Sequence, residues 1–301
     1  MSRIVLKPLR PDPLFSFAIF ADVHMRGNEK YRARRMRKAL LSVASSKYLD
    51  ALVTAGDNTD HGEEAHYRLL EEVFAERHLP PTVLCLGNHD LWTPGEDGKD
   101  DYDKAIELFK KYGTRITGEK IDKPYFRRDV RGYAFLCMGS EGTGVGACIG
   151  DEQIAWLDKE LASCPADKPV FVVSHYALNK THGLPKTFGD KEYDDMTGGF
   201  GPESDKINAV LQKYKNVVLF SGHSHMGFAK KKTYSTFEKV GNIHSVNLPC
   251  FMFFNHDGVF NSGCAMIVEV YPDEIVFRGR NYLYKIWYRR FTFHLKTVDI
   301  K

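Results

Sequence analysis

The sequence lacks long apolar runs, closely spaced cysteines and any strong charge imbalance. No stretch approaches the ~18 uninterrupted apolar residues of a membrane span, and residues 1–8 lack the apolar core of a secretory signal. The six cysteines are scattered without CxxC spacing, and a chain of this size does not need disulfides. A net charge of +3 is too small to favour nucleic acid or a membrane surface as a partner. We therefore expect a soluble cytoplasmic protein that binds no membrane, with a nucleic-acid partner disfavoured.

Length and composition predict an ordinary globular protein. The chain has 301 residues, of which 43% are hydrophobic and 27% are charged. That length is sufficient to bury a large core. Because the sequence shows no composition break, linker or internal repeat, we expect residues 1–301 to form a single domain.

Five short apolar segments are each followed by residue types that bind metals. Runs of this length are typical of buried strands, and ligands bind outside the carboxyl ends of strands in open α/β sheets. Five coincidences of this kind are hard to explain by packing alone. The segments are residues 15–21, 51–55, 82–86, 170–174 and 217–221, and the residues that follow them are Asp22 with His24, Asp57, Asn88, His175, and His223 with His225.

The remaining periodicity predicts an α/β fold in which two facing mixed sheets are flanked by helices, an α/β/β/α sandwich of four layers. Apolar residues recur with helical spacing in five segments, whereas other segments read as strands and give the last third a β-rich character. The expected helices are 31–48, 63–77, 101–112, 151–161 and 203–214. The additional strands are 124–128, 133–138, 243–248, 265–271, 274–280 and 284–295.

Several features outside the strand ends have less certain chemistry in the sequence alone. A long, turn-rich loop at about 177–202 follows His175, and we interpret it as a lid that lines the substrate site. The basic run from Arg32 to Lys38 fits a solvated helix face better than a phosphate-steering patch. We expect His61, His182 and His256 to be surface histidines, with His61 close enough to Asp57 to contact substrate.

The seven strand-end residues have the chemistry of a metal-binding set. Carboxylate oxygen and neutral imidazole suit manganese, iron, zinc and similar ions. Seven ligands are too many for one ion and fit two ions that share a bridging carboxylate. In Asp22-Val23-His24 and His223-Ser224-His225, the alternation places both ligands of each pair on the same side of an extended segment.

The order of these motifs resembles the calcineurin-like metallophosphoesterase superfamily. That pattern is D-x-H, G-D, G-N-H-[DE], a single H and G-H-x-H, and all five blocks are present in this order between Asp22 and His225. The block spacing and the β-rich end look similar to the branch that contains cyclic-nucleotide and glycerophosphodiester phosphodiesterases. Purple acid phosphatases differ, since they have glycine at the position of His24 and tyrosine at that of Asp60.

The resemblance implies a role for each motif residue. Asp22, His24 and His225 would hold one metal ion, and Asp57 would bridge to the second. Asn88, His175 and His223 would hold that second ion. His89 would contact the phosphate and assist the leaving group, as general acid or electrostatic donor, and Asp90 would orient His89.

The sequence leaves three functions open. We favour a small-molecule phosphodiesterase or phosphomonoesterase that uses a metal-activated hydroxide on a small phosphorylated substrate. A nuclease on DNA or RNA is the second reading, although the chain lacks a segment that predicts a DNA-binding cap. A non-catalytic scaffold is the third, but such a protein is expected to have lost ligands, and none is missing. The natural substrate, the metal identity and the oligomeric state do not follow from the sequence.

Overall fold

Two six-stranded sheets form the centre of the computed structural model, which describes residues 5–142, 146–183, 199–229, 234–253 and 262–300. The first sheet has the order β12-β11-β10-β1-β2-β3. In it β1, β2 and β3 run parallel, while β10 pairs with β1 antiparallel and leads into the antiparallel strands β11 and β12. The strands are β1 (Phe15–Phe20), β2 (Ala51–Ala55), β3 (Thr82–Cys85), β10 (Cys264–Val270), β11 (Glu274–Asn281) and β12 (Ile286–Lys296).

The second sheet has the order β4-β5-β6-β7-β9-β8. Its four central strands are parallel, and an antiparallel strand closes each edge, so this sheet is also mixed. The strands are β4 (Phe126–Val130), β5 (Tyr133–Met138), β6 (Val170–Ser174), β7 (Val217–Ser221), β8 (Phe237–Val240) and β9 (Ile243–Asn247).

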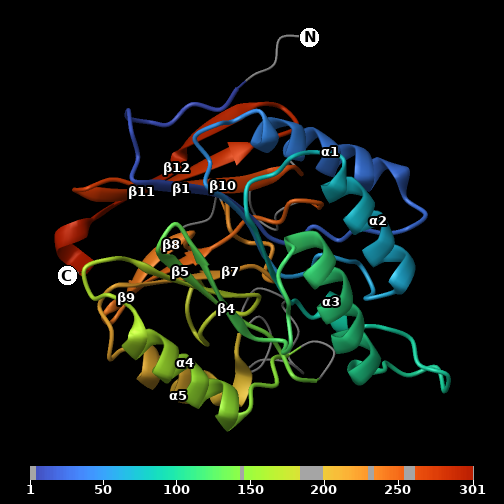
Figure 1. Cartoon of the computed structure of the whole chain (residues 1–301). Helices are drawn as coiled ribbons and strands as arrows, with labels where there is room; N and C mark the ends of the chain where they lie inside the picture. The colour runs from blue at the N-terminus through green and yellow to red at the C-terminus, as the bar shows by residue number, and fades with distance from the viewer. Residues whose placement is uncertain (1–4, 143–145, 184–198, 230–233, 254–261, 301) are drawn as a thin grey trace.

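Helices cover the outer face of each sheet. The apolar faces of α1, α2 and α3 pack on the first sheet, and those of α4 and α5 pack on the second. Figure 1 shows α1 and α2 on one side of the molecule and α4 and α5 on the opposite side, with the strands between them. The predicted α/β/β/α sandwich is therefore confirmed. The helices are α1 (Lys30–Ala44), α2 (Glu64–Ala75), α3 (Tyr102–Thr117), α4 (Asp151–Ser163) and α5 (Ser204–Leu211).

An apolar core lies between the two sheets and contains many aromatic rings. The ring of Phe17 meets Phe171 at 4.9 Å and Phe135 at 5.1 Å between centroids, both edge to face. Edge-to-face pairs contribute stability beyond the area that they bury. This core fixes the spacing of the sheets and brings the carboxyl ends of β1, β2, β3, β6 and β7 together.

The expectation that His182 lies on the surface was wrong. His182 is fully buried, with Nδ1 2.9 Å from the Ser235 carbonyl oxygen and Nε2 2.7 Å from Ser245 Oγ, because the loop after β6 packs onto β9. The basic run has the solvated face expected of it at Arg34 and Lys38, which are exposed, but Arg32 at its start is 4% exposed and belongs to an ion-pair network. Sequence periodicity also missed β8, a short edge strand with partly exposed side chains.

Other expectations fall outside what the structure describes. Residues 184–198, most of the expected lid at 177–202, and His256 lie outside the described residues. Within the described ranges, no helix combines the length and the apolar character needed to cross a bilayer.

Candidate metal centre

The strand-end residues predicted from the sequence converge where the two sheets meet. Asp57 Oδ2 lies 3.1 Å from His175 Nε2 and 3.6 Å from His24 Nε2. Asp22 Oδ1 lies 3.0 Å from His225 Nε2 and 3.9 Å from His175 Nε2. Asp57 is thus close to histidines from both sheets, the position that a bridging carboxylate requires.

His223 and Asn88 complete the set. The rings of His223 and His175 are 5.0 Å apart, and one group of potential ligand atoms joins these two residues with Asp57. Asn88 is buried directly after β3, and the backbone N–H of the next residue, His89, donates to Asp57 Oδ1 at 2.9 Å. The structure therefore brings these residues to the same end of the two sheets.

The backbone is unusual at five of the seven predicted ligands. Asp22, His24, Asp57, His223 and His225 have φ angles of 56°, 44°, 51°, 65° and 53°. This left-handed conformation costs a non-glycine residue roughly 1–2 kcal/mol. Such strain collects at functional sites, where it aims side chains that a regular strand would send elsewhere.

Glycines in the motifs allow the strand ends to approach one another. A Cβ on Gly87 would lie 2.1 Å from the Asp57 backbone nitrogen, and one on Gly56 would lie 2.6 Å from His175 Nδ1. A Cβ on Gly222 would lie 2.8 Å from that of Ala21. Any side chain at these positions would push the ligands apart, which explains why glycine belongs to the motifs.

Buried polar atoms at this centre lack hydrogen-bond partners. Asp22 Oδ2, His24 Nε2 and Asn88 Oδ1 are inaccessible to solvent and have no hydrogen-bond partner within the described part of the chain. Each such atom costs roughly 1–3 kcal/mol when left unsatisfied. Carboxylate, amide and imidazole donors together suit divalent transition metals. The donor set therefore fits a metal, and the chain carries a cluster of groups able to hold one.

Hydrogen bonds on the far side of the rings fix how the histidines point. His175 Nδ1 lies 2.8 Å from the Ala55 carbonyl oxygen, and His89 Nδ1 lies 2.8 Å from the Asp60 carbonyl oxygen. A carbonyl only accepts, so Nδ1 carries the hydrogen in both rings. The Nε2 atoms then face the centre, as in metal sites where an outer partner sets the tautomer.

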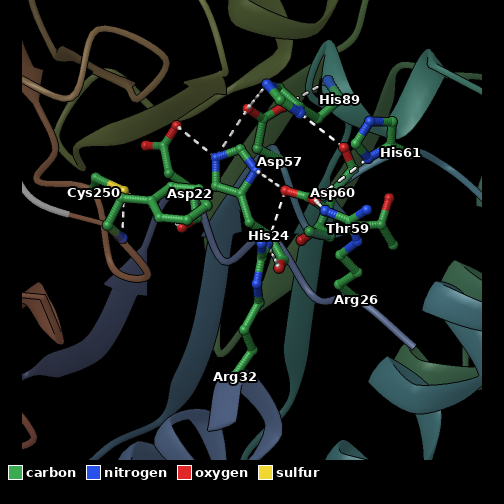
Figure 2. A network of polar contacts seen from close by, with 12 residues as sticks. Asp22, His24, Arg26, Arg32, Asp57, Thr59, Asp60, His61, His89 and Cys250 are labelled. Carbon is green, nitrogen blue, oxygen red and sulfur yellow. Dashed lines mark hydrogen bonds and ion pairs between the residues drawn. The ribbon is translucent and has the colours of Figure 1, made fainter. Parts of the chain in front are cut away.

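Asp60 is a candidate functional residue that the sequence motifs did not include. Its carboxylate lies 3.4 Å from His24 Nδ1, accepts from Arg32 Nη1 at 2.8 Å and from Arg26 Nη1 at 3.2 Å. Figure 2 shows Asp60 between the His24 ring and these two arginines. Burial opposes ionisation of Asp60, but His24 and Arg32 outweigh it and hold the pKa of the carboxyl well below its usual range. Its position three residues after Asp57 was the available signal.

Asp90 does not orient His89 directly, so this implied role needs correction. Its buried carboxylate accepts from the backbone N–H groups of Gly87, Asn58 and Thr59, and from the side chains of the latter two, at 2.8–3.1 Å. The His89 ring is held by the Asp60 carbonyl instead. Asp90 is therefore a positioning residue that ties the loop after β2 to the loop after β3.

The two carboxylates of the centre are held in the ionised form. Burial favours the neutral acid at Asp57, but His175 and His89 outweigh it and hold the pKa well below its usual range. At Asp22, burial is likewise outweighed by His225, which lowers the pKa of that carboxyl. Both carboxylates are thus ready to bind a cation at neutral pH.

Three side chains form a rim beside this centre. The Trp92 ring lies 3.7 Å from that of His89 and 5.9 Å from that of His61 between centroids. The side chains of His61 and Arg26 are 42% and 38% exposed, so they are accessible to a bound molecule. The expectation that His61 lies near the site is consistent with this geometry.

Comparison with known proteins identifies the family. The sequence profile described as calcineurin-like phosphoesterase matches residues 15–227. The chain belongs to the calcineurin-like phosphoesterase family. The match includes β1 to β7 and ends just after the His223/His225 motif, so the strand ends that carry the candidate ligands all lie inside it.

Curated relatives are about a quarter identical to the chain over the residues that align. A probable cyclic nucleotide phosphodiesterase of Fibrobacter succinogenes is 26% identical, over 63% of this chain and 64% of its own length. One of Rhodopseudomonas palustris is 25% identical over 69% and 71%. A probable glycerophosphodiester phosphodiesterase of Arcobacter nitrofigilis is 26% identical over 58% and 56%. The chain thus spans somewhat under two thirds of the first and third of these relatives, and the branch named by all three agrees with the resemblance seen in the motifs.

Solved structures show more distant similarity. A Streptococcus pneumoniae protein described as a predicted phosphoesterase aligns with a TM-score of 0.44 at 10% identity, covering 94% of this chain and 97% of that one. Vps29 from Entamoeba histolytica aligns with a TM-score of 0.36 at 10% identity, covering 94% and 99%.

Proposed function

We propose that the protein is a metal-dependent hydrolase of small-molecule phosphoesters, with phosphodiesters as its preferred substrates. The observation that carries this proposal is the convergence on one buried point of carboxylates and imidazoles from four strand ends and of the Asn88 amide from a fifth, with His89 beside it. The names of the curated relatives support the diester preference. The substrate we propose is a small phosphorylated molecule.

The centre offers ligands for two ions. Asp22, His24 and His225 would hold one, Asn88, His175 and His223 would hold the other, and Asp57 would bridge them. When bound, manganese, iron or zinc would supply an activated hydroxide and neutralise charge on the phosphate.

His89 has the position of a proton donor to the leaving oxygen. Its side chain is 23% exposed, and its Nε2 lies 4.0 Å from Asp57 Oδ2, at the open edge of the centre. The Asp60 carbonyl fixes the hydrogen on Nδ1. Protonated Nε2 can then donate to the ester oxygen, which contributes most for esters with poor leaving groups.

Paired hydrolysis assays test this function. Protein stripped with a chelator and reloaded with Mn²⁺ should hydrolyse bis(4-nitrophenyl) phosphate with a higher kcat/KM than 4-nitrophenyl phosphate, and the stripped protein should hydrolyse neither. A preference for the monoester would contradict the diester assignment. Turnover that is unchanged by metal removal would overturn the metal-dependent mechanism.

Two variants separate metal binding from proton donation. Asp57→Ala should lose bound metal and turnover together. His89→Ala should retain its metal content and lose about 10²–10⁴-fold in rate on esters with poor leaving groups, the range typical of general acid catalysis. Parental activity in His89→Ala on such esters would contradict the proposed role of His89.

A further inference from the structure

Cys250 lies in the metal centre although the sequence motifs do not include it. Within the described residues, it is the one cysteine that joins a group of potential metal ligands, the group that it forms with His24 and His225. Its ligand atom and theirs all lie within 4.8 Å of one another. The side chain is fully buried and follows β9, on a segment whose backbone bridges to Ala21 at the end of β1.

An independent observation marks this position as a ligand site. His24 is 1% exposed, and its Nε2 has no hydrogen-bond partner within the described residues. The nearby Asp22 Oδ2 is likewise buried without a partner. Two unsatisfied donor atoms beside the sulfur indicate that a cation belongs between these groups.

The surroundings of the sulfur suit a metal-bound thiolate. The Phe253 backbone N–H donates to Cys250 Sγ at 3.2 Å, an outer contact of the kind that orients ligands and tunes metal sites. The Phe253 ring lies 4.8 Å from the His24 ring between centroids and closes this side of the centre. Figure 2 shows Cys250 beside Asp22, across from His89 and His61.

We propose that Cys250 is a fifth protein ligand to the ion bound by Asp22, His24, His225 and the bridging Asp57. This inference rests on the metal centre of the proposed function. Sulfur is a softer donor than oxygen or nitrogen, so this half of the centre prefers zinc, iron or cobalt over manganese or magnesium. The two halves then differ in kind, because Asn88, His175 and His223 offer only nitrogen and oxygen.

The competing role for this cysteine is packing. Cys250 Sγ also lies 3.7 Å from the Asp22 carbonyl oxygen, where a neutral thiol can make a weak contact. A buried thiol often serves only as a small apolar group. The two roles predict different spectra for the metal-loaded protein.

X-ray absorption and cobalt spectroscopy test the ligand directly. In the zinc-loaded protein, the extended fine structure above the zinc absorption edge should show a sulfur neighbour at about 2.3 Å besides nitrogen and oxygen at about 2.0–2.1 Å. The Co²⁺-loaded protein should show a near-ultraviolet thiolate-to-cobalt charge-transfer band. Cys250→Ser should abolish both signals, whereas Cys137→Ala, which removes another buried thiol from the core between the sheets, should retain them.

Metal affinity provides a second readout. Cys250→Ser should lower the affinity for Zn²⁺ by about tenfold or more and change that for Mn²⁺ much less, since even indirect contacts contribute 10–100-fold. Bound zinc without a sulfur neighbour in the parental protein would overturn the proposal, and this result does not depend on whether the variant folds.

The outcomes also separate this proposal from the proposed function. A sulfur neighbour in a protein that hydrolyses no phosphoester would support Cys250 as a ligand and count against the hydrolase. Diester hydrolysis by a protein that binds zinc only through nitrogen and oxygen would support the hydrolase and overturn Cys250 as a ligand. Failure of the parental protein to bind any of these ions would overturn both.

Discussion

Asp60 connects the metal centre to helix α1. Its carboxylate faces His24 on one side and Arg32 on the other, and Arg32 also donates to the His24 carbonyl oxygen at 2.7 Å. Its own carbonyl holds the ring of His89. One residue thus positions a metal ligand through its side chain and the expected proton donor through its backbone.

Replacement of Asp60 by asparagine should weaken metal binding. The amide keeps the shape but loses the charge that orients His24, so we expect a 10–100-fold loss in metal affinity. The substitution also removes the carboxylate that pairs with the buried Arg32 guanidinium, so we expect a lower free energy of unfolding. Chelator-competition titration and chemical denaturation measure the two effects. Asp167→Asn at an exposed position is the matched control, and equal affinities for the two variants would contradict the role of Asp60.

The sequence singled out the candidate ligands because they follow apolar strands in short motifs, as Asp22, Asp57 and His175 do, and the structure brings them together. It did not single out Cys250 or the partners of Asp60, because these depend on contacts between segments far apart in the chain. His182 was assigned to the surface for the same reason, since its partners Ser235 and Ser245 lie more than fifty residues away.

Among the helices and strands, the sequence patterns located nearly every element but not where each one ends. The apolar runs predicted the strands of both sheets except β8, whose sequence Phe-Glu-Lys-Val has too weak an apolar signal. Helix ends differed by a few residues, as for α3, which continues to Thr117 and stops at Gly118 in the left-handed conformation. Local patterns thus locate elements better than they locate their ends.

Gly56 and Gly118 offer a matched test of the close approach between the sheets. Both have positive φ, at +85° and +74°, but only a Cβ at Gly56 meets another group, His175. Alanine at Gly118 should cost about 1–2 kcal/mol through backbone strain alone. Gly56→Ala should cost about 1–3 kcal/mol more, because it also crowds the site, and should lower metal affinity. Equal denaturation midpoints and metal affinities for the two variants would argue against this packing.

In the molecule as a whole, the aromatic core between the two sheets fixes the distance between the two halves of the metal centre. Phe171 from β6 packs against Phe17 from β1 and against Phe135 from β5. The candidate ligands Asp22 and His175 follow two of these same strands. The spacing of the sheets therefore also sets the spacing of the ligands.

Truncation of the Phe171 side chain should destabilise this core. Phe171→Ala removes a fully buried ring, and we expect a loss of about 3–5 kcal/mol in the free energy of unfolding. Tyr284→Ala, at a residue that is 63% exposed, should change it by no more than about 0.5 kcal/mol. Denaturant titration of both variants measures the difference, and a small effect at Phe171 would show that the core relaxes around the lost ring.

The pairing of β1 with β10 has a consequence for how the chain folds during synthesis. Phe15 in β1 is the partner of Val270 in β10, so the strand that leads to Asp22 has one open edge until β10 has been synthesised. Contacts of such long sequence separation slow folding, and an unpaired strand edge promotes aggregation. The nascent chain can complete the second sheet first, whereas the first sheet, and with it the metal centre, closes only when β10 arrives. Chaperone dependence of this protein should therefore be greatest in the interval before β10 is synthesised.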